Sequence, residues 1–283
     1  MKLTKSTLQA PTPCHSWVDT EDNSQTLYSK TYDENCHSTS GALSETYFNY
    51  VEGCHICQRM EATSEEAFTI LEVGLGLGLG VKATFEKLQS KAIGRPLHFI
   101  SLEIDPMLVN LVQKETIIEA ASFPGLNDLK KLQLDGDTIY QAQKGQNKLS
   151  ILIGDARNTV QALSKITDSP INAIYQDAFS PKKNACLWTT EWFRQLAHLS
   201  SKDVILSTYS SSTRIRLALR EAGFNVFSAS GFAAKKHATR AALSSTLQNY
   251  QSLEDTLAVS QTTSLKDAEL SDPNSDYFSP DFN

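Results

Sequence analysis

The sequence predicts an α/β protein whose central sheet is mostly parallel. An apolar run at 68–71 contains the β-branched pair Thr69 and Ile70, and Glu72 and four alternating glycines follow it. Short apolar runs of this kind are typical of strands buried on both faces of a sheet. Further apolar runs alternate with helical patterns along 97–229, an order that favours parallel strands joined by helices.

The glycine turn after this first strand narrows the class of ligand. A dinucleotide-binding fingerprint needs Gly-x-Gly-x-x-Gly, but Leu79 and Val81 stand where its third glycine belongs. The chain has instead an acidic residue followed by alternating glycines: Glu72, Gly74, Gly76 and Gly78. This pattern resembles motif I of S-adenosylmethionine (SAM)-dependent methyltransferases. The alternative is a glycine-rich turn that only closes a structural corner between a strand and a helix.

The length and composition set limits on the class of protein. At 283 residues, the chain is long enough for one large α/β domain with appendages. We expect a cytoplasmic protein, because no run approaches 18 apolar residues and the first ten residues lack the apolar core of a signal peptide. The five cysteines include a single Cys-x-x-Cys at 54–57, so neither a disulfide framework nor a metal site is expected.

We expect four segments along the chain. Residues 1–26 form a loose lead-in, and 27–66 form an N-terminal extension with an edge strand at 27–32 and a helix at 43–51. Residues 67–243 form the Rossmann-like domain. Residues 244–283 are rich in Ser, Thr, Gln and Asp without an apolar period, which predicts an acidic, disordered tail.

Acidic residues follow three of the predicted strands. Glu103 ends the strand at 97–102 and can accept both hydroxyls of a ribose, with Asp105 as the second choice. Asp155 follows the strand at 149–153 and either accepts an adenine amino group beside the small Ala156 or caps the next helix.

The fourth strand leads to the reacting end of the predicted site. Asp177 follows the strand at 171–176, at the sheet edge where ligands bind in such folds. Strands at 204–209, 224–229 and 241–243 complete a sheet of seven. Residues 123–147 are expected to be an irregular insertion with one short helix.

Charge is unevenly distributed. The segment 251–283 holds seven acidic residues and one lysine, whereas 182–240 holds ten basic and three acidic residues. Such a basic segment suits a polyanion, although ordinary solvated helix faces are an equally good interpretation.

Four separated stretches together resemble the bacterial tRNA 5-methylaminomethyl-2-thiouridine methyltransferases, in the stand-alone form without the FAD oxidoreductase domain. The resemblance spans about 27–243, and its most specific part is the segment from Asp177. The four stretches are Asp33-Glu-Asn-Cys-His37-Ser38-x-x-Gly41-Ala42-x-x-Glu45, the glycine motif from Glu72, Gly154-Asp155-Ala156, and Asp177-Ala-Phe-Ser-Pro181-x-Lys183-Asn184 with Leu187-Trp188.

The resemblance implies a class I SAM-dependent methyltransferase that N-methylates the 5-aminomethyl group of the wobble uridine (position 34) of tRNA. A separate FAD-dependent or aminomethyl-forming enzyme would supply that group. Asp177 would act at the amine, and tRNA would contact Phe179, Lys183, Arg214, Arg216, Lys235 and Lys236. The SAM site would comprise His37, Ser38, Gly41, Glu45, Glu72, Gly74, Gly76, Gly78, Glu103, Asp155 and Ala156.

Three departures from the family pattern keep two alternatives open. Gly80 replaces a polar residue, Cys36 replaces an aromatic residue, and Ala233 and Ala234 replace glycine in the late basic loop. An aminopropyltransferase shares the predicted fold, but it typically carries a further acidic pair where this chain has Ala-Phe-Ser-Pro. A degenerate module that binds SAM or tRNA without catalysis is the other alternative.

Overall fold

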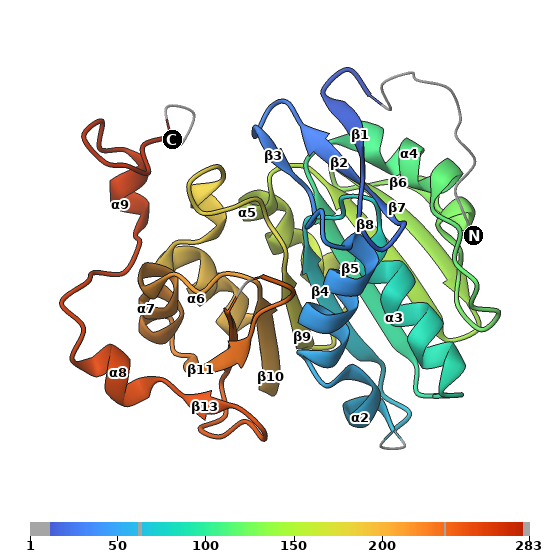
Figure 1. Cartoon of the computed structure of the whole chain (residues 1–283). Helices are drawn as coiled ribbons and strands as arrows, with labels where there is room; N and C mark the ends of the chain where they lie inside the picture. Colours follow the sequence, from blue (N-terminus) through green and yellow to red (C-terminus); the bar gives the residue numbers. More distant parts are fainter. Residues whose placement is uncertain (1–11, 62–63, 235, 280–283) are drawn as a thin grey trace.

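A ten-stranded sheet forms the centre of the computed structural model, which describes residues 12–61, 64–234 and 236–279 (Figure 1). The five strands β10, β9, β4, β5 and β8 pair in parallel, and the remaining pairs are antiparallel. In spatial order the strands are β13 (Gln251–Ser252), β11 (Asn225–Ser230), β12 (His237–Ala242), β10 (Ser200–Thr208), β9 (Ile171–Gln176), β4 (Phe68–Val73), β5 (Leu97–Glu103), β8 (Asn147–Ile153), β7 (Asp137–Lys144) and β6 (Lys130–Leu134).

The seven predicted strands are the contiguous block from β11 to β8, and β12 is the one that runs against the others within it. The predicted strand total is nevertheless wrong, because the sheet continues at both edges. Residues 123–147, expected to be irregular, contain the hairpin β6–β7, which pairs with β8. Its outermost strand is almost wholly exposed, so it lacks the apolar run by which the buried strands were identified.

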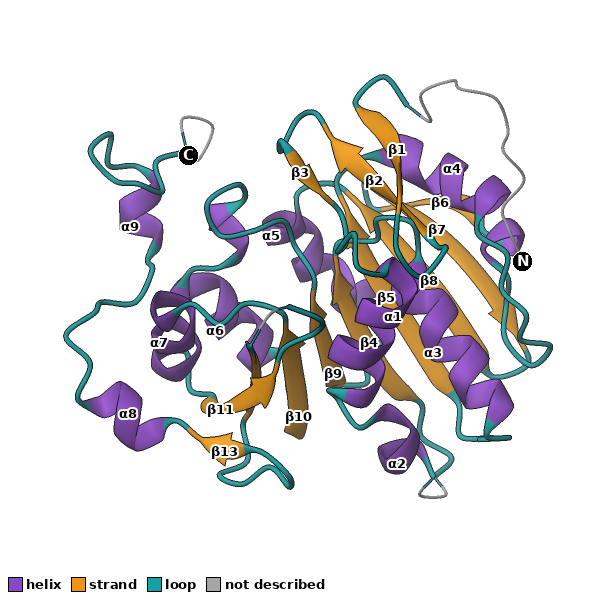
Figure 2. Cartoon of the chain, viewed as in Figure 1, coloured by secondary structure: helices purple, strands orange, loops and turns teal. Residues whose placement is uncertain are grey.

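Helices cover both faces of the sheet (Figure 2). Successive strand residues alternate between the two cores: Ile70, Phe99 and Ile151 pack on one face, whereas Leu71, Ile100 and Leu152 pack on the other. The first face is covered by α2 (Ile56–Met60), α3 (Leu79–Ser90), α4 (Pro106–Glu115), η1 (Tyr47–Glu52) and η2 (Leu126–Asp128). The second is covered by α5 (Ala156–Thr159), η3 (Val160–Lys165), η4 (Ala185–Leu187), α6 (Thr190–His198) and α7 (Thr213–Glu221).

The N-terminal extension is a small three-stranded sheet followed by a helix. The strand predicted at 27–32 overlaps β2 (Gln25–Ser29), and residues 30–32 form a turn. However, β2 is the central strand, between β1 (His15–Asp19) and β3 (Glu34–Asn35), and not an edge strand. The lead-in is therefore not loose from residue 15 onward, and its earlier part falls largely outside the described residues. The predicted helix at 43–51 is confirmed as α1 (Ala42–Thr46) continued by η1.

The acidic tail is folded, contrary to the prediction of disorder. It adds β13 to the sheet, then forms α8 (Glu254–Ala258) and α9 (Asp267–Leu270), and passes along α6 and α7 (Figure 1). Leu257, Leu265 and Leu270 are buried in the same core as α6 and α7. Three widely spaced leucines give no regular period, so the sequence pattern did not predict this packing.

Within the described ranges, no helix has the length and apolar character needed to cross a membrane.

Tail packing predicts a measurable stability contribution. Leu270 is fully buried, so Leu270→Ala should lower the free energy of unfolding by about 2–4 kcal/mol through lost burial and a residual cavity. Chemical denaturation measures this change. The control is Val259→Ala on the same segment, where the side chain is 80% exposed and the expected change is within about 0.5 kcal/mol. Equal, negligible effects of both substitutions would contradict the docked tail.

Candidate active site

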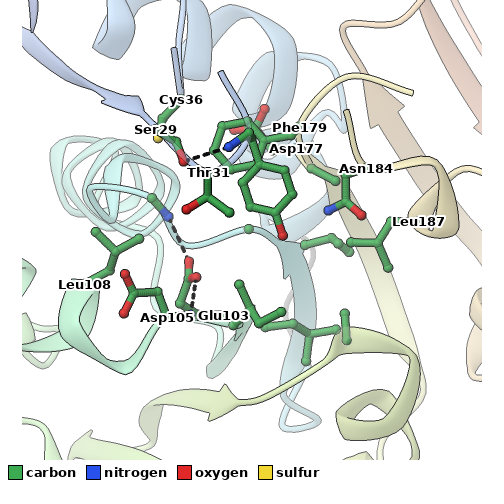
Figure 3. Close-up of a pocket in the computed structure, with 18 of the residues that line it drawn as sticks. Ser29, Thr31, Cys36, Glu103, Asp105, Leu108, Asp177, Phe179, Asn184 and Leu187 are labelled. Carbon is green, nitrogen blue, oxygen red and sulfur yellow. Dashed lines mark hydrogen bonds between the residues drawn. The ribbon is translucent and has the colours of Figure 1, made fainter. Parts of the chain in front are cut away.

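A cavity of about 470 Å³ lies at the carboxyl ends of β4, β5, β8 and β9, between these strands and the N-terminal sheet (Figure 3). Its size is within the range of about 300–1,000 Å³ that is usual for small-molecule sites. The structure brings together eight of the residues predicted from the sequence: His37, Gly74, Gly76, Glu103, Asp155, Ala156, Asp177 and Phe179 all line the cavity.

The glycine turn passes directly beside the end of β9. Gly74 has φ +100°, and a Cβ there would lie 2.9 Å from the carbonyl oxygen of Asp177. A side chain at this position would therefore be both strained and too close to the backbone. Gly74 therefore allows the turn after β4 and the end of β9 to form one wall of the cavity.

Glu72 was predicted to contact the cofactor, but it lies outside the cavity lining. Its carboxyl group is buried, accepts a hydrogen bond of 2.7 Å from Ser101 Oγ, and has a pKa raised well above its usual value by burial. A Cβ at Gly80 would lie 1.8 Å from Glu72 Oε1. Gly80 therefore leaves room for the position that the Glu72 carboxyl group takes in this structure, and a side chain at 80 would require Glu72 to move.

Glu103 lies at the cavity floor, at the end of β5 (Figure 3). Its Oε2 accepts hydrogen bonds from the backbone N–H groups of Leu75 (3.2 Å) and Gly76 (3.4 Å), and its Oε1 accepts one from Asp105 (2.9 Å). Burial raises the pKa of Glu103 to about 7, and these backbone donors oppose that rise. A carboxylate accepts about four hydrogen bonds, so these three leave one position, on Oε1, for a ribose hydroxyl, and a second hydroxyl would take the place of the long Gly76 contact.

Asp155 caps a helix and also lines the cavity. The helix is α5, and Asp155 Oδ1 accepts a 2.9 Å hydrogen bond from the Arg157 N–H. Asp105, the second choice for the ribose, likewise lines the cavity and caps α4 through the Met107 N–H. The helix-capping alternative for Asp155 is therefore confirmed without removing the residue from the site.

Asp177 is oriented by a tyrosine that the sequence did not identify. The hydroxyl of Tyr50, on η1, donates a 2.5 Å hydrogen bond to Asp177 Oδ1. Burial, followed by the nearby Asp177 charge, raises the pKa of Tyr50 well above its usual value, so this tyrosine remains a donor at neutral pH. The two residues are 127 positions apart, and no local pattern could have joined them.

Two neighbouring residues of the N-terminal motif, Cys36 and His37, line the cavity. The predicted contact is His37. It lies beside Gly76 and hydrogen-bonds through Nδ1 to Thr26 Oγ1 at 3.0 Å. Burial lowers the pKa of His37 to about 4, so the ring is neutral at pH 7. The other predicted contacts lie outside the lining and support it indirectly: Glu45 accepts the Ser38 N–H at 2.7 Å, Gly41 precedes α1, and Gly78 caps α3.

An aromatic pair lies at the cavity wall. The ring of Phe179 stacks on that of Tyr32 with a centroid distance of 4.3 Å, and both residues line the cavity. Tyr32 was absent from the predicted site. Trp188, for which core burial was the preferred interpretation, is fully buried and donates from Nε1 to the Phe179 carbonyl at 2.8 Å.

The predicted basic surface is largely engaged within the protein. Arg214 pairs with Glu269 of the tail at 2.5 Å, and Arg216 donates to Thr239 Oγ1 and the Ala238 carbonyl. These two arginines lie on α7 and do not line the cavity, and their contact with tRNA stays a prediction. Lys183 pairs with Asp33 at 3.0 Å, Lys236 is exposed, and Lys235 lies outside the described residues.

Comparison with known proteins agrees with this geometry. Residues 128–244 match the family described as S-adenosyl-L-methionine-dependent methyltransferase. The chain is 32% identical over 220 residues to the tRNA 5-methylaminomethyl-2-thiouridine biosynthesis bifunctional protein MnmC of Burkholderia multivorans, an alignment that covers 75% of this chain and 32% of that protein. The chain is thus similar in sequence to MnmC over three quarters of its own length, and part of it matches a SAM-dependent methyltransferase family.

Other relatives give the same result. MnmC of Ralstonia nicotianae is 32% identical over 222 residues, covering 77% of this chain and 33% of that protein. The chain spans about a third of the length of these curated relatives. A crystal structure of MNMC2 from Aquifex aeolicus superposes with a TM-score of 0.67 at 24% identity, covering 86% of this chain and 74% of that chain. The superposition confirms the predicted class I fold, and the match to the SAM-dependent methyltransferase family supports SAM as the cofactor.

Glu103 makes the stability of the chain depend on pH. In the unfolded chain its carboxyl ionises near 4.5, whereas in the folded chain it keeps its proton up to about 7. Between these values the folded state binds more protons, so this group makes the free energy of unfolding fall as pH rises. Over pH 4.5–7.5, wild type should lose on the order of 2–3 kcal/mol more than Glu103→Gln.

Urea denaturation across this pH range tests the prediction. Glu65→Gln is the control, because Glu65 is an exposed carboxylate outside the cavity lining, and its pH profile should follow that of wild type. A Glu103→Gln profile with the wild-type slope would contradict the assignment.

Proposed function

We propose that the chain transfers a methyl group from SAM to the 5-aminomethyl nitrogen of the wobble uridine (position 34) of tRNA, giving 5-methylaminomethyluridine. The observation that carries this proposal is the Asp177 carboxylate, which the Tyr50 hydroxyl orients at the cavity wall beside the glycine turn. The relatives named as tRNA 5-methylaminomethyl-2-thiouridine biosynthesis proteins support the choice of substrate. The substrate would place the reaction in the cytoplasm, after the enzyme that forms the aminomethyl group.

Asp177 would act on the protonation state of the amine. An aminomethyl group is largely protonated near neutral pH and then has no lone pair for attack on a methyl group. A carboxylate beside it can orient the amine, accept its proton and stabilise the cation formed on transfer. The Tyr50 hydrogen bond orients the Asp177 carboxylate. A carboxylate held in this way would keep the amine in line with the methyl group and the sulfonium of SAM.

The cofactor would lie along the ends of β4, β5 and β8. When bound, SAM supplies an electrophilic methyl group on its sulfonium. Glu103 would hold the ribose hydroxyls, and Asp155 with Ala156 would hold the adenine. All three residues line the same cavity, which supports their assignment to one ligand.

The uridine would enter at the aromatic pair. Tyr32 and Phe179 offer stacking surface on the cavity wall, and base–aromatic stacking is a usual means of holding a splayed RNA base. Lys183, two residues after Pro181, and the exposed Lys236 would contact phosphate groups. Apolar Ala178 and Phe179 follow Asp177 in the cavity lining, where an aminopropyltransferase would need a second acidic group.

A methylation assay tests the proposal. The purified chain is incubated with SAM and tRNA bearing 5-aminomethyl-2-thiouridine, and the digested nucleosides are analysed by mass spectrometry. A gain of one methyl group on that nucleoside is expected. Turnover with decarboxylated SAM and a polyamine would instead support the aminopropyltransferase, and SAM or tRNA binding without turnover would support the degenerate module.

The catalytic assignment gives a separate prediction. Asp177→Asn should lower kcat by about 10²–10⁴-fold, because the amide cannot accept the proton of the ammonium group. The SAM dissociation constant, measured by calorimetry, should stay within about twofold. Asn184→Ala is the control, since this residue also lines the cavity but has no part in the proposed proton transfer. Wild-type turnover by Asp177→Asn would remove Asp177 from the mechanism.

A further inference from the structure

The segment 264–270 of the tail is docked at the start of α6. Leu265 and Leu270 are fully buried. The Leu265 carbonyl accepts a 2.9 Å hydrogen bond from the Thr190 N–H, and the Asp267 N–H donates to Glu191 Oε2 at 3.0 Å. These contacts fix the position of the Asp267 side chain relative to the body of the protein.

Asp267 forms a two-point ion pair with Arg157. Arg157 Nη1 lies 3.0 Å from Asp267 Oδ1, and Nη2 donates to Oδ2. The Arg157 and Asp267 side chains are 16% and 24% exposed, so the pair is mostly shielded from water. Such paired, charge-assisted hydrogen bonds fix the plane of a guanidinium group.

The same guanidinium joins two walls of the cavity. Arg157 Nη1 also donates to the Cys186 carbonyl at 3.0 Å and to Thr189 Oγ1 at 3.0 Å. In sequence, Arg157 directly follows Asp155 and Ala156, which form one wall, while Cys186 and its neighbour Leu187 form another. On the sheet side, Gln176 Nε2 donates to the Leu187 carbonyl at 2.8 Å. Gln176 therefore holds the 186–187 wall from the sheet. Arg157, on α5, holds it from the other side and is itself paired with Asp267 of the tail.

We propose that Asp267 is a positioning residue for the SAM site, which acts through Arg157 to set the distance between the Asp155–Ala156 and Cys186–Leu187 walls. The inference rests on the proposed placement of the adenine end of SAM between these walls. It assigns to the C-terminal tail a part in cofactor binding, in addition to its packing against α6 and α7.

The test compares two neutralising substitutions on the same docked segment. Asp267→Asn removes the charge that orients Arg157, whereas Glu269→Gln removes the ion pair with Arg214 on α7, which does not line the cavity. Both should lower the melting temperature. Asp267→Asn should also raise the KM and the calorimetric Kd for SAM by about tenfold, with kcat at saturating SAM and the KM for tRNA within about twofold of wild type.

Each outcome decides between the claims. Wild-type protein that fails to bind SAM would overturn the proposed site itself. Normal SAM binding by wild type and unchanged affinity in Asp267→Asn would overturn the positioning role, as would an equal loss of affinity in Glu269→Gln. If Asp267→Asn fails to fold, Asp267→Glu retains the charge but displaces the guanidinium by its extra methylene. Its KM for SAM should then rise severalfold at unchanged kcat, and a wild-type KM would contradict the proposal.

Discussion

The close approach of the glycine turn to the end of β9 is the constraint on which the site depends. A Cβ at Gly74 would lie 2.9 Å from the Asp177 carbonyl oxygen, so a side chain there would push the ends of β4 and β9 apart. The same turn aims the Leu75 and Gly76 N–H groups at Glu103 and places Gly76 beside His37. One backbone path therefore organises one wall of the cavity, the Glu103 carboxyl group and the N-terminal cover.

The three carboxyl groups around this turn differ in their surroundings and therefore in what they can do. Glu72 is held by Ser101 beneath the turn and has a strongly raised pKa, which makes it a structural group. Glu103 faces the cavity and has a pKa near neutrality, a value that several backbone donors keep from rising further. Asp177 is fixed by Tyr50 at the opposite wall. Glu103 and Asp177 thus line the cavity, whereas Glu72 lies beneath the turn.

Local sequence patterns were sufficient for the parts of the fold that depend on local chemistry. The seven central strands follow from short apolar runs, and Glu103, Asp155 and Asp177 follow from their positions at strand ends. The hairpin β6–β7 escaped prediction because its outer strand is exposed. Glu72 was assigned to the ligand because its burial under Gly80 depends on how α3 packs on the sheet.

The remaining differences come from contacts between residues that are distant in sequence. Tyr50 meets Asp177 across 127 positions and Arg157 meets Asp267 across 110, and neither pair belongs to a common motif. The tail was assigned to disorder by its polar composition, yet its few leucines reach the core. Its Glu269 and Glu254 pair with Arg214 and Arg220 of the basic segment that was considered for RNA binding. The polar composition therefore reflects the exposed side of this segment and gave no indication that its leucines pack into the core.

A structure of the chain with S-adenosylhomocysteine and a 5-aminomethyluridine nucleoside tests the central claim most directly. We expect the ribose hydroxyls on Glu103, the adenine beside Asp155 and Ala156, and the aminomethyl nitrogen within hydrogen-bond distance of Asp177, facing the sulfur. Binding of the cofactor product outside this cavity, or an amine held away from Asp177, would contradict the account.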